Sequence, residues 1–78
     1  MLKEDFNFSY EAMAKLEDLG IYFADMNLKS YQDLVSFYWV SCDGKYTKNE
    51  LLRAVLSGQV PLTVSDIIDN FVNDTSKK

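Results

Sequence analysis

The stretch that most constrains the fold of this chain is residues 30–44, SYQDLVSFYWVSCDG. Ser30 with an aspartate three residues later is a pattern that begins a helix, and Asp43-Gly44 is a turn signal that ends one. Most of the residues between these signals are apolar, and a helix that is apolar on most sides is buried on most sides. We therefore predict a central helix over about residues 30–42, with the rest of the chain packed around it.

The predicted central helix has two sides of different character. At about 100° per residue, one wide apolar face forms, and we expect it to be core: Tyr31, Leu34, Val35, Tyr38 and Cys42. Phe37 and Val40 lie away from that face, and Trp39 lies at its edge. This second side is either a second core face or a surface that binds a partner, and the sequence leaves both interpretations open.

A helix over about residues 9–19 is predicted before the central one. Ser9 is a suitable N-cap, and Gly20 stands where a left-handed residue ends many helices. Glu11 and Lys15 are expected to pair on the solvent side, four residues apart. The apolar residues that share the opposite face are Ala12, Met13, Leu16 and Leu19.

Two more amphipathic helices are predicted after the central one, over about residues 47–57 and 63–72. Thr47 with Glu50 is the capping pair that begins the first of them, and either Thr63 with Asp66 or Ser65 alone caps the second. The expected core face of the first contains Leu51, Leu52, Val55 and Leu56. The expected core face of the second contains Val64, Ile67, Ile68, Phe71 and Val72.

The remaining segments are short. Phe6 and Phe8 alternate with polar residues, which predicts a short strand or an extended segment whose two rings fill the bottom of the core. The apolar connector of residues 21–28 is expected to form one short helical turn, with Ile21, Phe23 or Met26 tucked into the core. Its alternating Asp25 and Asn27 lack the glycine and the closing glutamate of a calcium loop, so we expect no metal site. We expect residues 1–4 and 74–78 to fray.

The fold class that these elements predict is all-α. With 78 residues, of which 47% are hydrophobic, the chain is long enough for a single domain. We predict a small bundle of four to five short helices around the central one, with one short extended segment at the N-terminus. Its single cysteine excludes an internal disulfide. Cys42 lies on the expected core face, so we interpret it as a buried structural residue.

Composition also bounds the function. Twelve acidic and eight basic residues give a net charge of −4, whereas binding to nucleic acid requires a basic patch. The chain has no histidine and no glycine-rich loop, so we expect neither an enzyme nor a cofactor or metal site. No apolar run is long enough to span a membrane and the N-terminus does not resemble a signal peptide, so we expect a cytoplasmic protein.

These exclusions favour a protein that binds other proteins. Aromatic anchors with apolar neighbours are typical of interface hot spots, and a groove between amphipathic helices is a common receptor for a partner helix. The predicted partner-binding residues are Phe37, Val40 and Trp39, with Tyr22 and Phe23 of the connector as further candidates. Self-association is also compatible with the aromatic content, so a homo-oligomer stays open.

Two strings of the sequence resemble a known family. FNFSYEAMAKLEDLG is similar to the opening of phage tail assembly chaperones, in which an F-x-F segment runs into a helix that ends at a glycine. SYQDLVSFYWVSCDGKYTKNELLRAVLSG and the later IIDNF resemble that family's central helix, the T-x-x-E-L helix after it and its final amphipathic helix. The similarity covers residues 5–73.

The resemblance implies a small cytoplasmic protein that acts while a long-tailed phage assembles its tail. Such chaperones bind the apolar, helical tape measure protein, keep it soluble until tail tube subunits surround it, and are absent from the mature virion. A longer, frameshifted form recruits the tail tube protein.

The alternatives are small acidic regulators or adaptors that act by protein–protein contact. Residues 47–58 and 63–72 can be read as a helix-turn-helix pair, although several aspartates would then face DNA phosphates. A protein that mimics DNA would need a denser stripe of carboxylates than a net charge of −4 provides.

Overall fold

The computed structural model describes the backbone of residues 1–27 and 29–76, together with their side chains except at 70 and 73–76. The part of the chain that it describes contains four α-helices and two short 3-10 turns and no strand, which confirms the predicted all-α bundle. In chain order the elements are η1 (Lys3–Asp5), α1 (Tyr10–Asp18), η2 (Phe23–Asp25), α2 (Tyr31–Ser41), α3 (Lys48–Ser57) and α4 (Val64–Ser76).

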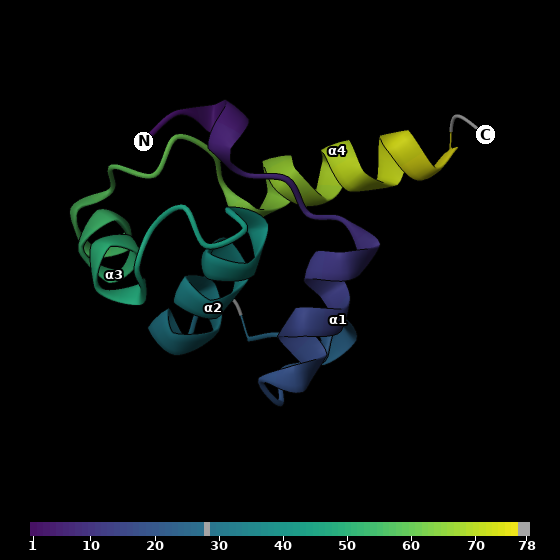
Figure 1. The fold of residues 1–78 in the computed structure, drawn as a ribbon, viewed down its shortest axis with the longest axis horizontal. Helices are drawn as coiled ribbons and strands as arrows, with labels where there is room; N and C mark the ends of the chain where they lie inside the picture. Colours follow the sequence, from purple (N-terminus) through teal and green to yellow (C-terminus); the bar gives the residue numbers. More distant parts are fainter. Residues whose placement is uncertain (28, 77–78) are drawn as a thin grey trace.

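Helix α2 is the central element of the bundle. It lies between α1 and α3 and packs against both of them (Figure 1). Helix α4 runs across the end of this layer, where α2 ends and α1 begins (Figure 1). Among the described residues, no helix is long and apolar enough to cross a membrane.

The predicted helix starts are confirmed by their caps. Each capping side chain accepts a hydrogen bond from the backbone N–H three residues later, which satisfies a donor that the helix itself leaves free. The four pairs are Ser9 with Ala12, Ser30 with Asp33, Thr47 with Glu50, and Thr63 with Asp66. Helix α4 extends to Ser76, beyond the predicted end at residue 72.

The segment before α1 is extended, without forming a strand. The backbone N–H of Asn7 donates to the carbonyl oxygen of Ser41 at 2.8 Å, so the segment is attached to the last turn of α2. Phe6 and Phe8 are both buried, as predicted. Figure 1 shows this purple segment passing beside α4 before it enters α1.

The ring of Phe8 is the point at which four segments of the chain meet. Its centroid lies 4.8 Å from that of Phe37 on α2, 5.2 Å from that of Phe23 in η2, and 5.4 Å from that of Phe71 on α4. Aromatic pairs at such distances add to the free energy gained by burial alone. The prediction that the N-terminal rings fill the bottom of the core is therefore confirmed.

The burial of α2 differs from the predicted pattern at its start. Val35, Tyr38 and Cys42 are buried and Leu34 is half-buried, but Tyr31 is 56% exposed. Its assignment to the core is therefore wrong. Tyr31 is the first residue of α2, at the end of the helix remote from the N-terminal segment and α4, so neither of them covers it (Figure 1).

On α3 and α4, too, fewer residues are buried than the sequence predicts. Leu51, Val64 and Ile67 are buried, but three residues assigned to these faces are exposed: Leu52, Leu56 and Val72. In the connector, η2 is the predicted helical turn, and Ile21, Phe23 and Met26 are all partly buried. Leu28, at the end of that prediction, and residues 77–78 of the tail lie outside the described residues.

The carboxylate of Asp5 attaches the N-terminal segment to the turn after α2. Its side chain is 6% exposed and accepts hydrogen bonds from the Lys45 ammonium, the Tyr46 hydroxyl and the backbone N–H of Leu2. These bonds favour the charged form of Asp5 and hold its pKa well below the usual value of 3.8. The bond from Lys45 makes the largest contribution.

We predict that Phe8→Ala largely unfolds the protein. Truncating a buried phenylalanine costs about 3–5 kcal/mol, which is about the whole free energy of unfolding of a domain of this size. Circular dichroism during urea unfolding measures the effect. The exposed Tyr22 provides the control, since Tyr22→Ala should change stability by about 0.5 kcal/mol or less. Equal urea midpoints for the two variants would contradict the central position of Phe8.

We also predict an acid-dependent contribution from Asp5. Because the pKa of Asp5 is lower in the folded than in the unfolded chain, its contribution to stability is complete above the unfolded value and is lost as the pH falls below it. The stability difference between wild type and Asp5→Asn should therefore shrink between pH 6 and about pH 3. Urea unfolding of both proteins at each pH checks this, and a constant difference would refute it.

Candidate functional site

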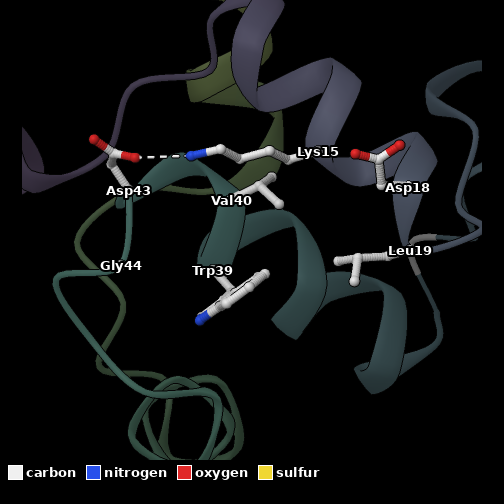
Figure 2. Close-up of a pocket in the computed structure, with 7 residues that line it drawn as sticks. All are labelled: Lys15, Asp18, Leu19, Trp39, Val40, Asp43 and Gly44. Atoms are coloured by element: carbon white, nitrogen blue, oxygen red, sulfur yellow. Dashed lines mark hydrogen bonds and ion pairs between the residues drawn. The ribbon is translucent and has the colours of Figure 1, made fainter.

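A surface groove lies between the end of α1 and the end of α2, which we call the α1–α2 groove. It has a volume of about 330 Å³. Its lining residues come from α1 and its C-cap, from α2, and from the turn that follows α2 (Figure 2): Lys15, Asp18, Leu19, Trp39, Val40, Asp43 and Gly44.

Two of the five predicted partner-binding residues line this groove, and the other three do not. Trp39 is half-buried and Val40 forms the floor, with 4% of its surface exposed. Phe37 is fully buried against Phe8 and presents no surface to a partner in this structure. At Phe37 the second side of α2 is therefore a core face, which corrects the binding interpretation of that residue, whereas Val40 and Trp39 line the groove.

The physical reason for this correction is the N-terminal segment. It covers the last turns of α2 on the side that the other helices leave open, through the bond from Asn7 to Ser41 and the ring of Phe8. The two connector candidates lie elsewhere. Tyr22 is exposed next to η2, and Phe23 packs on Phe8, so neither of them lines the α1–α2 groove.

Trp39 is held between the groove and α3. The ammonium of Lys48 lies 4.7 Å from the centroid of its ring, which is a cation–π distance. Trp39 therefore contacts the first residue of α3 and lines the groove at the same time. Leu19, the C-cap of α1, adds a second apolar side chain and is 39% exposed.

An ion pair crosses the groove above its floor. The Lys15 ammonium donates to the Asp43 carboxylate at 3.0 Å, and Figure 2 shows it reaching from α1 past Val40. Both side chains are largely exposed, and such pairs contribute about 1 kcal/mol or less. The predicted pairing of Lys15 with Glu11 is therefore wrong, because Asp43 competes for the same ammonium.

Beyond this ion pair the surface continues into a second, polar recess of about 560 Å³. It shares Lys15, Val40 and Asp43 with the α1–α2 groove. The recess is also lined by residues of the N-terminal segment, the start of α1 and the end of α2: Asp5, Asn7, Ser9, Tyr10, Glu11, Ala12 and Ser41.

Sequence reasoning missed five of the residues that line the groove: Lys15, Asp18, Leu19, Asp43 and Gly44. Lys15 and Asp18 are three residues apart, so the helical repeat could have placed them on one face. Leu19 was assigned to the core, although it follows the last turn of α1. Asp43 has a backbone φ of +54°, within the turn that Asp43-Gly44 predicts, but its position opposite α1 depends on how the two helices pack, which no local pattern predicts.

The protein is thus a small all-α bundle with an apolar surface groove that has charged edges. Comparison of the chain with models of protein families, with curated proteins and with solved structures found no match.

We predict that Phe37→Asp unfolds the protein, whereas Leu19→Asn does not. An unpaired carboxylate in the position of a fully buried ring is strongly destabilising. Its cost exceeds the free energy of unfolding of a domain of this size, which is roughly 3–5 kcal/mol. Leu19 is partly exposed, so an amide there stays hydrated. Circular dichroism distinguishes the two variants, and a folded Phe37→Asp variant would show that Phe37 is a surface residue after all.

Proposed function

We propose that this protein is a non-catalytic binding module for an apolar helical partner, and that the partner is the tape measure protein of a long-tailed phage. The observation that supports binding is the α1–α2 groove, in which Trp39 and Leu19 offer apolar surface above a buried floor. The partner itself is proposed from the resemblance of residues 5–73 to tail assembly chaperones.

The free energy that one groove can gain from apolar contacts is small, which favours binding of many copies of this protein to one partner. One apolar side chain buried in the groove contributes about 1.5–3 kcal/mol, whereas micromolar affinity requires about 8 kcal/mol. A single groove therefore binds weakly. Many copies along one long partner can nevertheless cover its apolar stripes, and self-association of the module would strengthen this by avidity.

The same resemblance supports the place and time of action. We propose that the protein acts in the cytoplasm of the host cell, that it is released before the virion is complete, and that a longer form of it recruits the tail tube protein. This role needs neither a cofactor nor a catalytic group.

Co-expression with the tape measure protein of the same phage tests the proposal. We expect the wild-type protein to keep the tape measure protein in the soluble fraction and to co-purify with it. Leu19→Asn should reduce the retained amount several-fold, because it removes apolar surface from the groove. The matched control is Leu56→Asn on α3, where the side chain is 59% exposed and does not line the groove.

Two results would contradict the proposal. An insoluble tape measure protein in the presence of folded wild-type protein would contradict the function. Equal losses of retention for Leu19→Asn and Leu56→Asn would show that the α1–α2 groove is not the binding site.

A further inference from the structure

The edge of the α1–α2 groove carries an excess of negative charge. The groove and the polar recess beside it are lined by four carboxylates and one ammonium: Asp5, Glu11, Asp18, Asp43 and Lys15. Lys15 pairs with Asp43, and Lys45 pairs with Asp5. Among the residues that the structure describes, Glu11 and Asp18 have no ion-pair partner.

Two of the four carboxylates, Asp18 and Asp43, lie at helix C-termini, where the helix dipole disfavours negative charge. Asp18 is the last residue of α1, and Asp43 follows the C-cap of α2. A helix C-terminus carries a partial negative charge and favours cations. The last turn of α2 contains no basic residue, and that of α1 contains only Lys15. An added cation would therefore be stabilised at both helix ends.

From this charge distribution we propose that the α1–α2 groove binds a cationic amphipathic helix of a partner protein. Its apolar side chain enters between Leu19 and Trp39, and its Lys or Arg side chains pair with Glu11 and Asp18. This inference rests on the proposed binding function and specifies the chemistry of the segment that is bound.

The spacing of the two carboxylates sets the register of the partner. Glu11 and Asp18 are seven residues apart on α1, which places them about 10 Å apart along one side of the helix. Basic residues with the same separation, two helical turns apart on the partner, match them. The apolar side chains between those basic residues then face Val40 and Trp39 on the groove side.

The single tryptophan of the chain reports on the groove. The probe is a synthetic amphipathic helix of leucine and lysine residues, with lysines two turns apart, and its control is the same peptide with glutamate in place of lysine. We expect the lysine peptide to shift the emission of Trp39 in a saturable way. Binding should weaken as salt is raised, because salt screens exposed charges. The glutamate peptide should produce no shift.

A pair of charge-reversal variants locates the effect. Asp18→Lys should weaken binding of the lysine peptide about tenfold, since it replaces an attraction by a repulsion and leaves the apolar floor unchanged. Asp69→Lys makes the same change in net charge at an exposed position of α4 that lines neither recess, and should leave binding within about twofold. Circular dichroism confirms that both variants are folded.

Three outcomes would overturn the inference: equal binding of the two peptides, equal effects of the two variants, or an emission shift that depends only on protein concentration. The last would identify a second copy of this chain as the occupant. Failure of the proposed function is a separate result. If the lysine peptide binds but the tape measure protein is not retained, the groove chemistry stands without that partner. If the tape measure protein is retained equally by wild type and Asp18→Lys, the function stands and the charge inference falls.

Discussion

The packing of Phe8 against Phe37 is the contact on which the rest of the structure depends. A bundle of short helices has little core of its own, because each helix can bury only one stripe against its neighbours. Here an extended segment supplies the missing apolar volume, and its ring contacts α2, α4 and the turn before α2. The backbone bond from Asn7 to Ser41 holds that segment in place.

This arrangement also decides which surface is left for binding. Because the N-terminal segment covers one side of α2, Phe37 is part of the core and presents no surface to a partner, whereas the largely buried Val40 forms the floor of the groove. Their neighbour Trp39 lies on the uncovered flank, where Leu19 from the end of α1 faces it across the groove. The candidate site therefore lies at the edge of the core, next to residues on which the stability of the fold depends.

The charged residues at the edge of the groove are a candidate source of the selectivity that its apolar floor does not provide. An apolar groove of this size provides little selectivity on its own, and in the proposed complex Asp18 and Glu11, which lack an ion-pair partner among the described residues, would select a cationic segment. The unfavourable position of Asp18 and Asp43 at the helix C-termini costs a little helix stability. Local rules of this kind are often broken at functional sites, which is why the acidic edge of the groove supports a binding role.

The sequence by itself determined the helices, since their caps at Ser9, Ser30 and Thr47 and their apolar repeats act through neighbours along the chain. It also determined the all-α class and the burial of the N-terminal rings. Only the tertiary structure decided which side of α2 is covered, that Tyr31 is exposed, and that Lys15 pairs with Asp43. The physical reason is that caps and periodicity depend on contacts three or four residues apart, whereas coverage depends on segments that meet only after the chain has folded.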